Sequence, residues 1–230
     1  MRKLFICFLA ILLISITFSR CFDLAFDIPY NAKPLNEDYA CLADKGYYTG
    51  VIEGLKSNGN CALDAEYKLN FCNQHQSRCD LSFDLDLDKD PVKQIDDAFD
   101  CLKGLNVQNY KFNKLWIIVE LGRQANGEWP ISNDSDRSSN VEFISNVLDT
   151  IANYLEVNRI GFETNESDWN RITGGSTIGI GFDLYYHGNY QQSFEDFTPF
   201  GGWTFSQVEM KKYATSKDIC QESFDLAIIQ

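Results

Sequence analysis

A single carboxylate ends a short apolar stretch in the middle of the sequence. Residues 115–122 read Leu-Trp-Ile-Ile-Val-Glu-Leu-Gly, and the apolar run before Glu120 predicts a strand that is buried on both faces. Burying a carboxylate is costly unless the group is paired or protonated, so Glu120 is a candidate member of a functional site. The alternative is a glutamate that simply reaches solvent where the strand ends.

Other acids stand at or near the ends of further predicted strands: Asp27, Glu53, Asp84 or Asp86, and Glu163. The carboxyl ends of the strands of a parallel barrel face the same way, so these acids should meet Glu120. Glycoside hydrolysis needs one acid to protonate the leaving oxygen and a second carboxylate to support the sugar. Aromatic rings that could stack on the sugar are Trp129, Tyr185, Tyr186 and Trp203.

The predicted elements alternate along the first two thirds of the chain. Hydrophobic patterns predict strands at 23–28, 47–55, 80–87, 115–120 and 160–163, and helices at 35–45, 62–72, 91–104 and 140–155. Strand candidates at 178–186, 203–213 and 223–229 follow without a strong helix between them. This order predicts an α/β fold, a modified single-domain (β/α) barrel that is similar to a TIM barrel and irregular in its C-terminal part.

The N-terminus predicts a secretory signal. Arg2 and Lys3 precede the apolar run of residues 5–18, which is too short to span a bilayer, so residues 1–21 are expected to be removed and residues 22–230 to form the mature domain. Cleavage after Cys21 leaves six cysteines that can all pair: Cys41, Cys61, Cys72, Cys79, Cys101 and Cys220. We expect disulfides with an open pairing scheme, and a secreted protein or one of a phagosomal or lysosomal lumen.

Composition excludes some partners. The formal charge is −13, from 20 basic and 33 acidic residues, which disfavours nucleic acids and anionic membranes. Zinc is the alternative reading of the cysteines, but none of them have the close spacing of a finger or ribbon. We expect a monomer without a metal or another cofactor.

Several segments resemble glycoside hydrolase family 25, the lysozymes with a modified β/α barrel that cleave peptidoglycan between its amino sugars. The resemblance is to the nematode and protist members and runs in order through nearly the whole mature chain. Phe26-Asp-Ile-Pro is similar to the first-strand motif, whose aspartate is catalytic, which implies that role for Asp27. Further similar segments lie at 41–54, 162–175 and 193–204, and the last is the most specific.

Two positions depart from the family pattern. The fourth strand of the family ends in Asp-x-Glu, and here Ile118 precedes Glu120; a later strand usually ends in Tyr-Asp, and here His187 follows Tyr186. The resemblance therefore implies Glu120 as general acid and Asp27 as its partner, with two supporting carboxylates lost. We place Trp129, Tyr185, Tyr186, His187, Glu163 and Trp203 in the substrate site.

Two of these residues have an alternative interpretation. His187 could adjust the protonation of Glu120, but a histidine hydrogen-bonded in the barrel mouth is the favoured interpretation. Glu163 stands where the family usually has tyrosine, so it could also be a surface replacement. The acid-rich run at 84–90 departs from a calcium loop, which favours a solvated strand edge.

Three functions fit the sequence. The leading hypothesis is a lysozyme-like hydrolase of bacterial peptidoglycan that uses Glu120 and Asp27. The second is a glycan-binding protein that has lost catalysis with the changes at Ile118 and His187. The third is a disulfide-stabilised scaffold with a vestigial barrel mouth.

Overall fold

The computed structural model describes residues 22–29, 32–56, 65–104, 112–124 and 126–230. Within these residues the strands are β1 (Asp23–Ile28), β2 (Tyr47–Lys56), β3 (Arg78–Asp84), β4 (Leu115–Ile118), β5 (Ile160–Thr164), β6 (Asp183–His187), β7 (Val208–Ile219) and β8 (Glu222–Ile229). The helices are α2 (Asn36–Asp44), α3 (Ala65–His75), α4 (Pro91–Gly104), α5 (Asp134–Ile151) and α6 (Glu166–Thr173), with 3₁₀ turns η2 (Val157–Arg159) and η3 (Phe205–Gln207).

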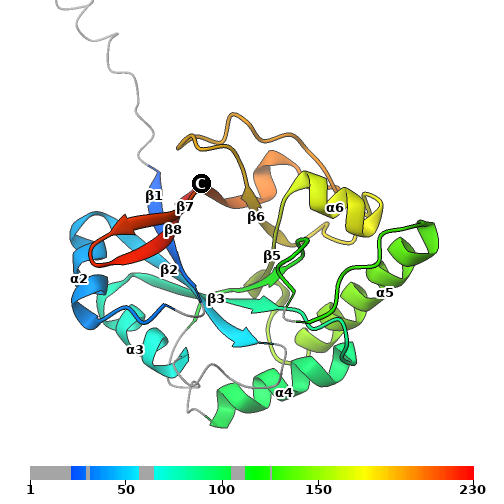
Figure 1. Cartoon of the computed structure of the whole chain (residues 1–230), viewed down its shortest axis with the longest axis horizontal. Helices are drawn as coiled ribbons and strands as arrows, with labels where there is room; N and C mark the ends of the chain where they lie inside the picture. Colours follow the sequence, from blue (N-terminus) through cyan, green and yellow to red (C-terminus); the bar gives the residue numbers. More distant parts are fainter. Residues whose placement is uncertain (1–21, 30–31, 57–64, 105–111, 125) are drawn as a thin grey trace, which may run out of the picture.

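The strands form a closed barrel in the order β1 to β8. Neighbours from β1 to β7 pair in parallel, whereas β8 is antiparallel to both β7 and β1. Helices α2 to α6 lie around the outside of the barrel, and β6, β7 and β8 follow one another with no α-helix between them (Figure 1). The predicted barrel with an irregular C-terminal part is confirmed.

Two apolar layers hold the barrel. The larger one packs the outer face of the sheet against the helices, and it includes Phe26, Phe83 and Ile117. The smaller one fills the barrel interior and consists of Ala25, Val51, Trp116, Tyr185, Met210 and Ala227. Glycine is required at Gly161, because a Cβ there would lie 2.3 Å from the Trp116 ring. The interior layer forms the floor beneath the polar groups at the carboxyl ends of the strands.

The alternation of apolar and polar residues in β3 is typical of a strand with one solvent-facing side, but that expectation is wrong because both sides of β3 are buried. Leu81 and Phe83 belong to the layer under the helices, so Ser82 and Asp84 face the barrel interior. Ser82 is 3 % exposed and Asp84 is 6 % exposed. Asp86 is also buried, and Asn126 donates a hydrogen bond to its carboxylate at 2.9 Å, so residues 84–86 are not a solvated strand edge. A polar barrel interior produces the same alternation as contact with water.

Three boundaries differ from the sequence prediction. Helix α5 begins at Asp134 with Asn133 as its N-cap, whose side chain accepts a hydrogen bond from the Asp136 amide. Asn140, where the predicted helix begins, is buried within the observed helix and donates to the Pro130 and Ile172 carbonyls. Residues 178–182 form turns before β6, and β7 begins only at 208, after η3.

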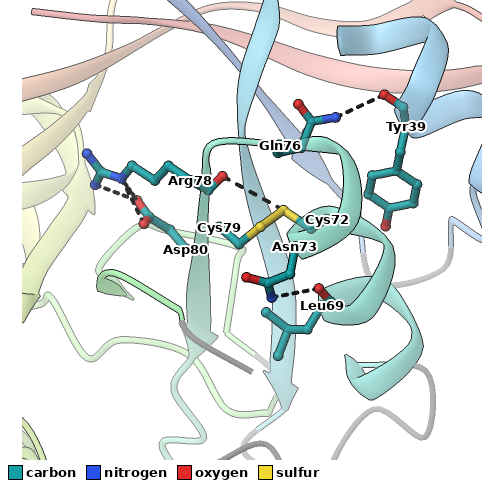
Figure 2. The surroundings of a disulfide bond; sticks show 8 residues. All are labelled: Tyr39, Leu69, Cys72, Asn73, Gln76, Arg78, Cys79 and Asp80. Atoms are coloured by element: carbon teal, nitrogen blue, oxygen red, sulfur yellow. Dashed lines mark hydrogen bonds and ion pairs between the residues drawn. A yellow bond between two sulfur atoms is a disulfide. The ribbon is translucent and has the colours of Figure 1, made fainter. Parts of the chain in front are cut away.

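Disulfides fasten helices to the barrel. Cys41 of α2 is bonded to Cys220, which lies between β7 and β8, and Cys72 of α3 is bonded to Cys79 of β3. Figure 2 shows the second bond at the end of α3, where Gln76 also donates to the Tyr39 carbonyl at 2.9 Å. Cys101 is disulfide-bonded as well. The prediction of disulfides over zinc is confirmed for these five cysteines.

The predicted signal at residues 1–21 lies outside the described residues and stays a prediction. None of the helices that the structure describes is both long enough and apolar enough to cross a membrane.

Candidate functional site

Charged side chains gather above the interior layer, at the end of the barrel toward which the parallel strands run. Each of β1, β5, β6, β7 and β8 contributes one, and Glu120 follows β4 by two residues: Asp27, Glu163, His187, Lys212, Asp225 and Glu120. The prediction that acids of successive strands would meet is confirmed for Asp27, Glu120 and Glu163, because one chain of ion pairs connects them.

Glu120 lies at one end of this chain. It is 4 % exposed, and its Oε1 lies 2.7 Å from Nδ1 of His187. Asn165 at the start of α6 donates to the same oxygen at 3.3 Å. Thr164 donates to the Val119 carbonyl at 2.6 Å, which holds the backbone after β4 against β5. The carboxylate is therefore fixed between β4, β5 and β6 rather than released into solvent where the strand ends.

Glu163 occupies the centre of the ion-pair chain. Its Oε1 lies 3.0 Å from Nε2 of His187 and 2.9 Å from Nζ of Lys212. Burial by itself would raise the pKa of Glu163, but Lys212, His187 and Arg123 outweigh it and hold that pKa far below its usual range. Because Glu163 is only 1 % exposed, its interpretation as a surface replacement is wrong.

His187 bridges the two glutamates with its two ring nitrogens. Burial and Lys212 act to lower the pKa of His187, yet the hydrogen bonds to Glu120 and Glu163 raise it above its ordinary value. The favoured interpretation of a histidine hydrogen-bonded in the barrel mouth is confirmed. Its raised pKa also means that the imidazolium persists to a higher pH than in a free histidine.

Asp27 lies at the other end of the chain. Lys212 Nζ is 2.7 Å from its Oδ2, and the Tyr185 hydroxyl lies 2.8 Å from both of its carboxylate oxygens. Burial raises the pKa of Asp27 to about 6, against the opposing effect of Lys212 and with a further contribution from Glu163. Asp225 completes the surroundings of Lys212 at 3.4 Å.

Arg123 extends over the acids from the loop that follows β4. Its guanidinium nitrogens lie 3.8 Å from carboxylate oxygens of Glu120 and Glu163, 3.9 Å from Glu53 and 4.0 Å from Asp84. Burial and the hydrogen bond that the Asp84 carboxyl donates to Glu53 raise the pKa of Asp84 to about 9. Asp84 therefore holds a proton at neutral pH.

Two cavities flank the contact between Glu163 and His187. One of about 260 Å³ is lined by residues that include Asp27, Glu53, Ser82, Arg123, Glu163 and Lys212. The other, of about 240 Å³, is lined by residues that include Tyr186, His187, Asp196, Phe197 and Phe200. A carboxylate row with open space on both sides suits an extended ligand that crosses the row.

The predicted aromatic residues divide into two groups. Tyr186 lines the second cavity and donates to Asp196 at 2.8 Å, whereas Tyr185 is fully buried and positions Asp27 from below. Trp203 is fully buried against Trp169, and Trp129 is 3 % exposed. A ring without an exposed face cannot stack on a sugar, so the structure argues against the sugar-stacking roles of Trp129, Trp203 and Tyr185.

Sequence reasoning missed the cations. Lys212 stands in a predicted strand two residues after the inward-facing Met210, and that alternation could have placed it in the barrel interior. Arg123 follows Glu120 by three residues, in a loop where sequence alone gives no orientation. Neither residue could be assigned to the site from the sequence, because most of their partners lie on other strands.

A metal ion has one plausible set of ligands among the described residues. Donor atoms of Glu120, Glu163 and His187 lie within 4.8 Å of one another. Lys212 and Arg123 already bring positive charge within 2.9 Å and 3.8 Å of Glu163, which opposes a divalent ion there. The protein's own cations thus fit this position better than a metal.

Residues 20–213 match the family described as Lysozyme-like protein 1. The chain belongs to this lysozyme-like family. It is 29 % identical over 193 residues to the probable GH family 25 lysozyme 2 of Dictyostelium discoideum, covering 83 % of this chain and 84 % of that protein. The resemblance to family 25 lysozymes is therefore confirmed.

Solved structures of lysozymes share the barrel. A family GH25 lysozyme from Aspergillus fumigatus superposes with a TM-score of 0.68 at 15 % identity, covering 90 % of this chain and 93 % of that chain. The modular autolysin of Streptococcus pneumoniae, solved with a synthetic peptidoglycan ligand, gives a TM-score of 0.66 at 12 % identity over 91 % of this chain and 47 % of that one. At these identities the likeness shows the fold alone.

Proposed function

We propose that this lysozyme-like protein hydrolyses bacterial peptidoglycan between its amino sugars, with Glu120 as the general acid and Asp27 as a carboxylate partner. The family is one of lysozyme-type glycoside hydrolases, which supports the reaction class. Glu120 would give its proton to the glycosidic oxygen as the bond to the anomeric carbon breaks. Water would then add to that carbon, and its proton would pass to the Glu120 carboxylate.

One observation carries the proposal. Glu120 is held, buried, in the row of ion pairs that also contains Asp27, and cavities lie on both sides of that row. His187 lies 2.7 Å from the acid and holds its carboxylate in the row, while the attacking water restores the proton that Glu120 donates. The row borders these cavities through His187, which lines the one of about 240 Å³, and through Asp27 and Glu163, which line the one of about 260 Å³.

A binding protein without catalysis is the second candidate. Ile118 stands where the family carries an aspartate, and three cations are paired with the remaining carboxylates: Arg123, His187 and Lys212. Neutralised carboxylates support less positive charge on a sugar at the transition state. This candidate predicts that amino-sugar oligomers bind without being cleaved.

Release of soluble fragments from purified peptidoglycan between pH 4 and 8 separates the two candidates. We expect release by the wild type and a loss of at least about 100-fold in Glu120→Gln, because the amide cannot donate the proton. Glu128→Gln is the matched control, since Glu128 is exposed and lies in the same loop. Equal release by Glu120→Gln and wild type would refute the proposed acid, and binding without release by wild type would favour the second candidate.

We also propose that the protein acts as a monomer after removal of residues 1–21, outside the cell or in a phagosomal or lysosomal lumen. The charged start and short apolar run of the sequence support the removal of residues 1–21, and the disulfides support an oxidising compartment. N-terminal sequencing of protein collected from the medium or from isolated phagosomes should begin at Phe22. A mature protein that retains Met1 would contradict the proposed processing.

A further inference from the structure

The position of the missing carboxylate has a direct neighbour on the next strand. Ile118 of β4 is the register partner of Glu163 of β5 in their parallel pairing. Paired residues of adjacent strands point to the same face of a sheet, and the strands lie about 4.8 Å apart. Glu163 therefore presents a carboxylate to the barrel mouth one strand away from the place where Ile118 presents a methyl group.

The surroundings of Glu163 suit a permanent negative charge. Lys212, His187 and Arg123 contact its Oε1 at 2.9, 3.0 and 3.8 Å. Three cationic side chains from three different segments converge on this one oxygen. The carboxylate also lines the cavity of about 260 Å³, so it borders space that a ligand can enter.

Glu163 is also close enough to Glu120 to act with it. Donor atoms of Glu120, Glu163 and His187 all lie within 4.8 Å of one another, and His187 contacts both carboxylates. Paired carboxyl groups of glycosidases that work without a water molecule between them are about 5 Å apart. Asp27 is connected to Glu120 less directly, through Lys212, Glu163 and then His187 or Arg123.

We propose that Glu163 is the anionic partner of Glu120, supplying from β5 the negative charge that Ile118 cannot supply from β4. The inference rests on the proposed hydrolase function and adds a second carboxylate to Asp27. Glu120 protonates the leaving oxygen as the bond between that oxygen and the anomeric carbon breaks, and the electron pair of the bond leaves with the oxygen. Glu163 stabilises the positive charge on the sugar until water adds and its proton passes to Glu120.

Relocating the carboxylate tests this role. The variants are Glu163→Gln, Ile118→Asp and the double variant that carries both changes, each measured for kcat and KM on soluble peptidoglycan fragments. Glu163→Gln should lower kcat at least about 100-fold and change KM by less than about threefold, because the charge acts mainly in the transition state. The kcat of the double variant should be at least about tenfold higher than that of Glu163→Gln.

Two controls separate catalysis from folding. Glu156→Gln changes an exposed glutamate before the opposite end of β5 and should keep wild-type rates. Thermal unfolding of every variant sets an assay temperature at which all are folded. Recovery by a carboxylate on another strand would not be expected if Glu163 only held Lys212 and His187 in place.

The outcomes are distinguishable. If the wild type releases fragments and Glu163→Gln releases them at a rate within threefold of it, the inference is overturned and the proposed hydrolase stands. The same holds if the double variant is no more active than Glu163→Gln. A wild type that releases nothing while Ile118→Asp hydrolyses would show that Glu163 does not replace the missing charge. No release by the wild type or by any variant would end the proposed function and this inference together.

Discussion

Replacing Lys212 by methionine should destabilise the protein strongly and in a pH-dependent way. The ammonium is 4 % exposed and contacts Asp27, Glu163 and Asp225, while methionine keeps most of the buried stem without the charge. Removing one partner of a buried ion pair costs about 3–5 kcal/mol, because the remaining charge stays buried and unpaired. For a domain of this size each kcal/mol lowers Tm by about 2–4 °C, so Lys212→Met should lose roughly 6–20 °C at pH 7.5.

The pH dependence distinguishes an electrostatic effect from a packing effect. The folded-state pKa of Asp27, about 6, is above its unfolded value of 3.8, so protonation of Asp27 favours folding and that stability is lost as pH rises through 6. Lys212 lowers this pKa, and its removal should raise it further. The gap in Tm between Lys212→Met and wild type should therefore shrink as the pH falls from 7.5 to 5.

Differential scanning calorimetry at pH 5, 6 and 7.5 measures this gap. The control is Lys103→Met, which removes an exposed pair with Asp100 and should lower Tm by no more than about 4 °C at any pH, because exposed pairs contribute about 0–1 kcal/mol. A loss in Lys212→Met no larger than in the control, or a gap that stays constant between pH 5 and 7.5, would refute the reasoning.

Three further predictions concern stability and product chemistry. Thermal stability against pH should peak near about pH 4, because the raised pKa values of Asp27 and Asp84 remove stability as the pH rises from 3.8 through about 6 and about 9, while the lowered pKa of Glu163 removes stability as the pH falls below 4.5; a Tm that rises from pH 5 to 8 would contradict this. Removing the Cys41–Cys220 bond by a double serine substitution should cost about 5 kcal/mol, since it closes a loop of 179 residues, and a Tm drop under 2 °C would contradict that estimate. The short separation of Glu120 and Glu163 predicts a retained anomeric configuration, and NMR that shows initial inversion would exclude it.

The barrel could be predicted because its signals are local. In α4, Pro91 at the first helical position predicts the observed start, and the helical spacing of apolar residues up to Gly104 predicts the observed end. The acids near strand ends meet because parallel strands share one direction, which follows from the alternation of strands and helices. Glu120 and Asp27 could thus be placed in one site before any coordinates were known.

The features that could not be predicted from the sequence depend on contacts between distant segments of the chain. Lys212 lies 185 positions after Asp27 in the sequence, and only closure of the barrel by β7 and β8 brings the two together. The alternating polar residues of β3 give the sequence pattern of a solvent-facing strand, although they are buried, because the barrel mouth that they face is polar. Trp203 stands in the motif that is most similar to the family, yet that motif is a packing element in which Gly179 approaches the indole ring.

The most direct test of the central claim is mass spectrometry of borohydride-reduced products after digestion of purified peptidoglycan at pH 5 by wild type and Glu120→Gln. The account predicts new reduced amino-sugar ends with the wild type and at least about 100-fold fewer with Glu120→Gln, because the buried glutamate provides the proton for the leaving oxygen. Equal yields from both proteins, or no new reducing ends from a folded and oxidised wild type, would contradict it.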